Sequence, residues 1–221
     1  KEVGNEFVNL FKMIYAKKEQ TERGRQESNK LLRLMAKKQI LKLTMESMDG
    51  KITENEVYQV MLRLPTGKQA GPNRIPNAVY KHLAAFFAPK LAQVVNEATR
   101  KGHLPRHFLE GDISMLYKKG DRCDPRNYRP ITLLNTDYKV FTRVLANRMK
   151  KAVHEFVSEC QKGFVPDVFI AEATALLKLV EAYTNEDGED RKGILLFLDM
   201  EKAFDRVSYD FTLSGLKAFG F

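Results

Sequence analysis

An uninterrupted apolar run, Ile194 to Leu198, constrains the fold of this chain more than any other stretch. It stands inside the segment GILLFLDMEKAFDRV and ends on the acid Asp199. A short apolar run with such boundaries predicts a β-strand that is buried on both faces. Such a strand would deliver Asp199 to the end of a sheet, where ligands bind in many folds. We therefore expect a small antiparallel sheet whose end, carrying Asp199, faces an open cleft.

A carboxylate at the end of a buried strand can have several roles. Its desolvation is unfavourable unless the group is paired, hydrogen-bonded or bound to a metal. Metal binding is one alternative, and phosphatase-like and nucleotide-binding folds offer others. A phosphatase-like nucleophile is disfavoured, because those enzymes place a second aspartate two residues after the first, where this chain has Glu201.

The positive charge of the chain is concentrated in one segment. The formal net charge is +9, and residues 100–151 hold thirteen Lys and Arg against five Asp and Glu. A clustered basic segment favours a polyanionic partner, because neutralised phosphates release condensed counterions. A solvated basic face without a partner is the alternative. The two cysteines, Cys123 and Cys160, are too far apart for a zinc motif and predict reduced thiols.

The spacing of apolar residues predicts a mainly helical chain with a few strands. Thr53 and Glu56 form a capping box at the start of one helix, and Ser208 caps the last. The polar segment TERGRQESN, residues 21–29, is interpreted as a mobile linker, and residues 64–76 as an ordered loop. Helices are expected over residues 1–20, 31–45, 77–100, 136–156 and 170–183, from Thr53 and from Ser208, and strands over 113–117, 128–134 and 194–198.

Five segments together resemble a known family. FLDMEKAFDRV resembles motif A of the reverse transcriptases of non-LTR (LINE-type) retrotransposons. NYRPITLLNTDYKVFTRVLANRM is similar to the signature finger segment of that family. GHLPRHFLEGDISMLYKKGD, SECQKGFVP and the entry segment KQAGPNRIPNAVYK stand in the family's order and spacing. The resemblance covers about residues 50–221.

The resemblance implies an α+β fold, namely the fingers and the first part of the palm of a right-hand polymerase. It implies a helical N-terminal connector over 1–50, fingers over 51–187 and the start of the palm over 188–221. The implied activity is RNA-directed DNA polymerase, with an RNA template, a DNA primer and dNTPs as partners. No membrane and no obligate protein partner is expected, and the implied location is a cytoplasmic and nuclear ribonucleoprotein.

The family's remaining motifs, including its paired aspartates, would lie beyond Phe221. Two-metal chemistry needs more than one carboxylate, so this chain alone is expected to be inactive. The alternative function is a non-catalytic nucleic-acid-binding module derived from a decayed retroelement.

In motif A the resemblance implies that Asp199 binds both catalytic Mg²⁺ ions and that the carbonyl of Met200 adds a ligand. Phe204 matches the steric gate, whose ring would occupy the space of a ribose 2′-hydroxyl. The alternative for Phe204 is a plain core aromatic residue. Asp205 is expected to order the turn before the helix capped by Ser208.

On the finger hairpin, Arg129 matches the arginine that grips the incoming triphosphate, and Lys118 or Lys119 matches its basic neighbour. A guanidinium fork suits phosphate oxygens better than an ammonium. Other residues are nucleic-acid contacts by the same resemblance, with plain solvated charge as the alternative for the basic ones. They are Arg126, Arg143, Arg148, Lys150, Lys151, Gln161 and Gly163.

Two departures from the family pattern stand in loops. The family's GPDG reads Gly71-Pro72-Asn73-Arg74 here, which replaces a turn acid and a glycine. Its PGRS reads Pro166-Asp167-Val168-Phe169, which removes a glycine, an arginine and a serine. The loss of a positive charge and the gain of Asp167 are expected to weaken contact with a nucleic-acid backbone.

Overall fold

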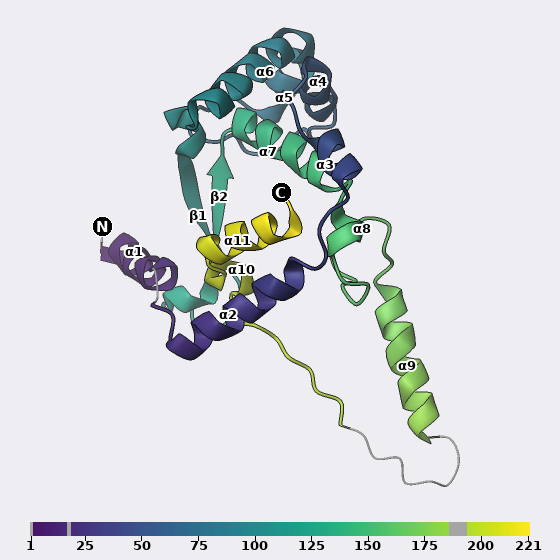
Figure 1. The fold of residues 1–221 in the computed structure, drawn as a ribbon. Coiled ribbons are helices and arrows are strands. Elements are labelled where there is room, and N and C mark those ends of the chain that lie inside the picture. The colour runs from purple at the N-terminus through teal and green to yellow at the C-terminus, as the bar shows by residue number, and fades with distance from the viewer. Residues whose placement is uncertain (1, 17–18, 186–193) are drawn as a thin grey trace. The chain divides into compact units, whose positions relative to one another are not determined.

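The computed structural model describes residues 2–16, 19–185 and 194–221 (Figure 1). Helices dominate these residues, and one two-stranded sheet accompanies them. The expected helix-rich α+β class is confirmed. The chain forms two compact units, one of residues 1–13 and 46–149 and the other of residues 14–45 and 150–221. These units do not coincide with the regions drawn from the motifs, so the assignment of fingers and palm to residue ranges remains a prediction.

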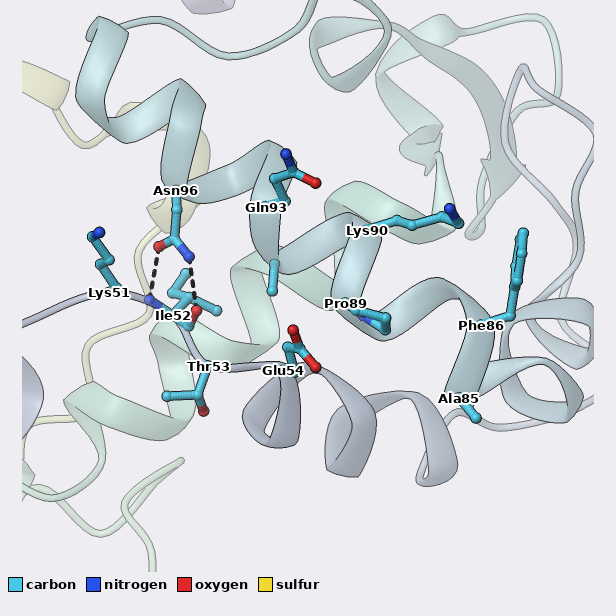
Figure 2. Close-up of a pocket in the computed structure, with 11 residues that line it drawn as sticks. Lys51, Ile52, Thr53, Glu54, Ala85, Phe86, Pro89, Lys90, Gln93 and Asn96 are labelled. Carbon is cyan, nitrogen blue, oxygen red and sulfur yellow. Dashed lines mark hydrogen bonds between the residues drawn. The ribbon is translucent and has the colours of Figure 1, made fainter.

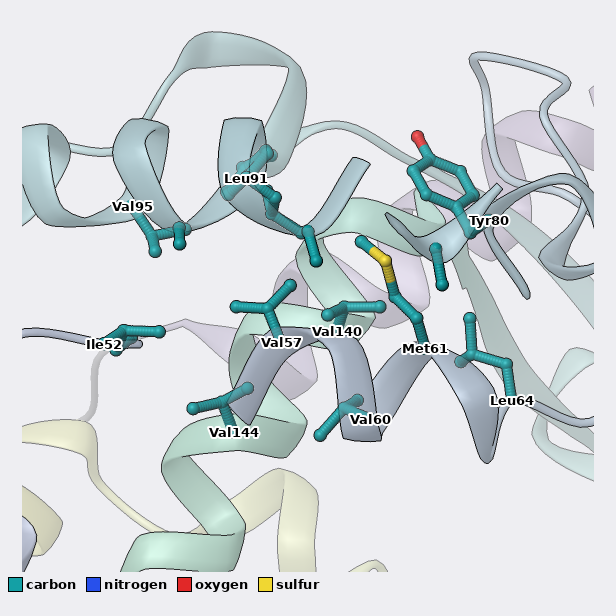
Figure 3. Packing of buried hydrophobic residues seen from close by; sticks show 14 residues of the cluster. Ile52, Val57, Val60, Met61, Leu64, Tyr80, Leu91, Val95, Val140 and Val144 are labelled. Carbon is teal, nitrogen blue, oxygen red and sulfur yellow. The ribbon is translucent and has the colours of Figure 1, made fainter. Parts of the chain in front are cut away.

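The core of the first unit lies between α4 (Glu54–Leu62), α6 (Ala84–Lys101) and α7 (Thr136–Met149). Apolar side chains recur on one face of each helix and meet there, because burial removes their surface from water. Figure 3 shows these side chains converging from the three helices. The central ones are Val57, Met61, Leu91, Val95, Val140 and Val144, and Phe108, from the 3₁₀ turn Arg106–Leu109, belongs to the same cluster.

The start of α4 follows the sequence signal. The Thr53 hydroxyl accepts a hydrogen bond from the Glu56 amide at 3.2 Å, and the Glu56 carboxylate accepts one from the Thr53 amide at 2.9 Å. The expected capping box is confirmed. The helix expected over 77–100 is instead broken at Leu83 into α5 (Asn77–His82) and α6. The break allows Tyr80 and Ala84, on either side of it, to be buried in the same core.

The two strands β1 (Gly111–Tyr117) and β2 (Tyr128–Leu134) form an antiparallel hairpin. Their register pairs Leu116 with Arg129 and Tyr117 with Tyr128. Two 3₁₀ turns accompany the strands, Arg106–Leu109 before β1 and Pro125–Asn127 before β2. The predicted hairpin is therefore confirmed.

The N-terminal helix α1 (Glu2–Tyr15) is also confirmed. Within the first unit its Phe7 ring packs edge-on against Tyr128, with centroids 5.2 Å apart.

The predicted linker over 21–29 is wrong, because α2 (Glu22–Met35) runs through it. The Thr21 hydroxyl caps this helix by accepting a hydrogen bond from the Gly24 amide at 3.1 Å. A glycine in the first turn is tolerated there, and the helix packs against α11 (Tyr209–Phe219). The helix expected over 31–45 ends early at Met35, and α3 (Lys42–Met48) follows after a turn.

The rest of the second unit contains short and long helices. The helix expected over 136–156 is divided, because α7 of the first unit ends at Met149 and the separate α8 (Val153–Phe156) belongs to the second unit. In the second unit α9 (Ala171–Asn185) confirms the helix expected near 170–183. A single turn, α10 (Ala203–Arg206), precedes α11. The Ser208 hydroxyl accepts a hydrogen bond from the Phe211 amide at 3.4 Å, so the predicted cap of the last helix is confirmed.

The predicted strand over Ile194–Leu198 is wrong. Residues 194–200 have no regular secondary structure, and every side chain of the apolar run is more than half exposed. A strand is stabilised by hydrogen bonds to neighbouring strands and by burial of its faces. Among the described residues only β1 and β2 pair, so this run has no neighbour that could complete it.

Candidate nucleotide and nucleic-acid site

The hairpin of the first unit places two cations on one face. Side chains alternate between the faces of a strand, so Leu116 and Lys118 point the same way. Because Arg129 pairs with Leu116, it lies on that face too, diagonal to Lys118. The Lys118 amide donates to the Asn127 carbonyl at 2.9 Å, which extends the pairing beyond Tyr117. Both cationic side chains are exposed and can reach a polyphosphate.

The loop that joins the strands is ordered by its own contacts. The Tyr117 hydroxyl donates to the Gly120 carbonyl at 2.6 Å, and the Tyr128 hydroxyl donates to the Arg122 carbonyl at 2.9 Å. Arg126 is ion-paired with Asp124 at 2.8 Å while its side chain stays largely exposed. The carboxylate of Asp124 raises the pKa of Arg126. Lys119 lies in this loop and is exposed, so the register favours Lys118 over Lys119 as the neighbour of Arg129.

The structure corrects one of the predicted nucleic-acid contacts. Arg148 faces the interior side of α7, where its guanidinium binds the Glu56 carboxylate and three backbone carbonyls. Only 12% of its side chain is exposed. Its donors are therefore used inside the protein, and Arg148 is a structural residue. Arg143, on the same helix, is exposed, as are Lys150 and Lys151 after its end.

The loop that departs from GPDG keeps a tight conformation. Gly71 is buried, and a Cβ there would lie 2.5 Å from the backbone nitrogen of Asn135. The Asn73 side chain accepts a hydrogen bond from the Ile75 amide at 3.0 Å, as an aspartate can do. Arg74, in the place of the family's glycine, has φ 60°. The substitutions therefore preserve the turn, although Arg74 adopts a conformation that favours glycine.

The segment around the QxGF element belongs to the second unit. Gln161 is exposed and donates from its amide to the Gly163 carbonyl at 3.0 Å. Phe164 is fully exposed and has φ 62°. In the departure from PGRS, Asp167 stands where the family has glycine and has φ 58°. Aspartate tolerates the left-handed region better than most residues, so the backbone conformation is again compatible with a glycine.

The motif A segment presents its predicted residues to solvent. Asp199 is exposed, Met200 is 74% exposed and Phe204 is 88% exposed. The reading of Phe204 as a plain core aromatic therefore does not hold in the described residues. Asp205 accepts a hydrogen bond from the Tyr15 hydroxyl at 2.8 Å.

The motif A segment offers the kind of ligands that a divalent ion needs, but too few of them. Asp199 offers a carboxylate and Met200 a carbonyl, the oxygen donors that Mg²⁺ prefers. No group of three or more His, Cys, Asp and Glu side chains that could hold an ion occurs in the part of the chain that the structure describes. These residues alone therefore do not complete a metal site.

Each unit has a hollow among its described residues. A groove of about 1230 Å³ in the second unit is bordered by Tyr15, Arg25, Phe204 and Tyr209. A hollow of about 710 Å³ in the first unit is lined by none of the catalytic or binding residues predicted from the sequence (Figure 2). Among its lining residues the Asn96 side-chain amide holds the backbone of Ile52 by two hydrogen bonds of 2.8 Å, which are dashed in Figure 2.

Sequence reasoning missed two side chains that shape these segments. Asn135 is buried, and its side chain accepts from the Asn73 amide at 3.0 Å and donates to the His107 carbonyl at 2.8 Å. Asn135 lies within the finger segment, but the neighbouring sequence gives no sign that its side chain bonds to Asn73 and His107. Tyr15 lies in the helix expected over residues 1–20, and no local signal in the sequence links it to Asp205.

Comparisons with known proteins agree with the motifs. Residues 116–221 match the family model described as reverse transcriptase (RNA-dependent DNA polymerase). The uncharacterized 149 kDa protein of transposon TX1 from Xenopus laevis is 30% identical over 80% of this chain and 13% of its own length. Two probable RNA-directed DNA polymerases of Drosophila melanogaster are also similar. The one from transposon BS is 30% identical over 75% of this chain and 18% of its own length. The one from transposon X-element is 33% identical over 69% of this chain and 17% of its own length. The chain thus spans 13–18% of the length of these curated relatives.

In the described residues, no helix is both long and apolar enough to cross a membrane.

Proposed function

We propose that this chain, which matches the reverse transcriptase family model over residues 116–221, belongs to the branch found in non-LTR retrotransposons and forms the fingers and the start of the palm of an RNA-directed DNA polymerase. The proposed substrates are dNTPs, with an RNA template and a DNA primer. The proposed setting is a ribonucleoprotein of the cytoplasm and nucleus.

The observation that carries this proposal is the common face of Arg129 and Lys118 on the hairpin. A guanidinium fork can bind two phosphate oxygens at once, and an ammonium beside it adds a point charge. Two exposed cations on a rigid hairpin can hold a triphosphate without a large entropic cost, because the loop beneath them is already ordered. Hydrogen bonds of Tyr117 and Tyr128 to loop carbonyls supply this order.

In the second unit, Asp199 and the carbonyl of Met200 are the oxygen ligands that we propose this chain contributes to two Mg²⁺ ions. When bound, such ions lower the pKa of a primer 3′-hydroxyl and neutralise phosphate charge. We propose that the Phe204 ring excludes a ribose 2′-hydroxyl. Arg126, Arg143, Lys150, Lys151, Gln161 and Gly163 are the proposed contacts with the nucleic-acid backbone.

The test is primer extension on an RNA template by a longer polypeptide that contains this chain. Asp199→Asn is expected to abolish synthesis while leaving template binding intact, because the amide keeps the shape but not the charge. Arg129→Ala is expected to raise the KM for dNTPs by roughly tenfold or more, the factor for one lost charge-assisted hydrogen bond. Glu181→Gln, which changes an exposed acid of α9, is the matched control. Synthesis that persists in Asp199→Asn would overturn the proposed role.

A further inference from the structure

The short turn that carries Phe204 has little packing of its own. α10 spans only Ala203–Arg206 and has no buried residue. Lys202, at its start, has φ 51°, a conformation that is unfavourable for a side chain other than glycine. A strained and exposed turn keeps its position only if contacts around it hold it there.

Contacts inside the turn supply part of that support. The Arg206 amide donates to the Lys202 carbonyl at 3.2 Å, and the Arg206 guanidinium donates to the Glu201 carboxylate at 3.0 Å. Both contacts join residues that lie within positions 201–206. They stabilise the shape of the turn, but they do not attach it to the rest of the second unit.

Tyr15 supplies an attachment from outside the turn. Its hydroxyl donates to Oδ1 of Asp205 at 2.8 Å, across 190 positions of sequence. A hydrogen bond to a carboxylate is stronger than one between neutral groups. Burial, together with the Asp205 carboxylate, raises the pKa of Tyr15 to about 12, so the phenol remains a donor at neutral pH. Both Tyr15 and Phe204 border the 1230 Å³ groove of the second unit.

We propose that Tyr15 is a positioning residue, which holds Asp205 and thereby places the adjacent Phe204 ring for discrimination between deoxyribose and ribose. This inference rests on the proposed function. A steric gate separates substrates that differ by one hydroxyl, so a displacement of about 1 Å is enough to weaken it. The Phe204 ring is 88% exposed, so little packing restrains it and its position depends largely on the backbone that Asp205 anchors.

The first experiment measures hydrogen exchange of the 201–206 amides by mass spectrometry on this chain. Tyr15→Phe removes the hydroxyl and is expected to speed exchange roughly five- to tenfold, the factor for one net hydrogen bond in a local opening. Asp205→Ala is expected to have the same effect, and the double variant no more than either. Asp205→Asn keeps an acceptor oxygen and should restore much of the protection. Tyr209→Phe, a tyrosine of the same groove, is the matched control.

The second experiment measures incorporation of deoxy- and ribonucleotides by a longer polypeptide that contains this chain. Tyr15→Phe is expected to lower the discrimination severalfold, with a smaller change in the rate of DNA synthesis, and Asp205→Asn to retain most of it. Unchanged exchange in Tyr15→Phe would overturn the proposal. Discrimination that stays at the parent level in Tyr15→Phe, while Phe204→Ala lowers it, would also overturn the proposal and leave the proposed function standing. If Phe204→Ala leaves discrimination unchanged, the gate assignment fails and the positioning role falls with it. Failure of the polymerase function itself is detected separately, by the absence of primer extension in the parent polypeptide.

Discussion

Arg148 of α7 and Glu56 of α4 form a two-point ion pair, in which Nε lies 2.6 Å from Oε1 and Nη2 lies 2.7 Å from Oε2. The same guanidinium donates to the carbonyls of Met48, Gly50 and Lys51 at 2.8–3.1 Å. The Glu56 carboxylate also accepts a hydrogen bond from the Thr53 amide in the capping box. One side chain therefore joins the segment before α4, the first turn of α4 and the end of α7.

Replacing Arg148 tests this arrangement. Arg148→Ala is expected to lower the free energy of unfolding by about 2–3 kcal/mol, because it leaves carbonyls and a carboxylate without their donor. Arg148→Lys should recover only part of the loss, since an ammonium cannot form the planar fork. Urea denaturation provides the measurement, with the exposed Arg143→Ala on the same helix as the control. An equal loss in the two alanine variants would contradict the structural role.

The same pair predicts a loss of stability in acid. The hydrogen bond from Arg148 is the largest cause that lowers the pKa of Glu56, which falls from the ordinary 4.5 to about 2. A lowered folded-state pKa contributes stability above pH 4.5, and this contribution is lost as the pH falls towards 2. Glu56→Gln should therefore destabilise the protein at pH 6 and have a smaller effect near pH 2.5. Glu54→Gln, an exposed neighbour, is the control, and a penalty for Glu56→Gln that is independent of pH would refute the linkage.

The left-handed loop residues predict a gain in stability. Arg74 has φ 60° in a place where the family has glycine, so Arg74→Gly relieves backbone strain. Glycine also increases the entropy of the unfolded chain, which offsets part of this gain. The net gain expected in the free energy of unfolding is therefore roughly 0.5–1 kcal/mol. Asp167→Gly should gain less, because aspartate tolerates φ 58° better. Thermal unfolding of both variants gives the comparison, and a loss in Arg74→Gly would argue against strain at this position.

The revised set of basic residues predicts the salt dependence of nucleic-acid binding. The chain is expected to bind duplex with a log–log salt slope near −0.9 for each phosphate that it neutralises. Replacing Arg143, Lys150 and Lys151 together by alanine should flatten the slope by up to about 3. A triple variant of Lys30, Lys37 and Lys38, which lie outside the basic segment, is the control. Filter-binding titrations from low to moderate salt measure both slopes, and an unchanged slope in the first variant would remove these residues from the interface.

The sequence by itself determined the features whose causes are local. The β1–β2 hairpin follows from two short, mainly apolar runs with turn residues between them, and the start of α4 follows from Thr53 and Glu56 three positions apart. The resemblance to reverse transcriptases was also readable from the sequence, because the motifs are short runs in a set order, and the family model matches residues 116–221. Each of these signals is complete within a few residues of the chain.

The tertiary structure alone decided the features that depend on distant partners. Arg148 looked like its exposed neighbours on a basic helix, and only the approach of Glu56 and three carbonyls assigns it to the interior. Residues 22–29 looked like a linker, yet they belong to a helix that packs against α11. The run Ile194–Leu198 has the composition of a strand but no neighbour among the described residues. Propensity describes what a segment can form, whereas hydrogen-bond partners and burial decide what it does form, and those are supplied by residues far away in the sequence.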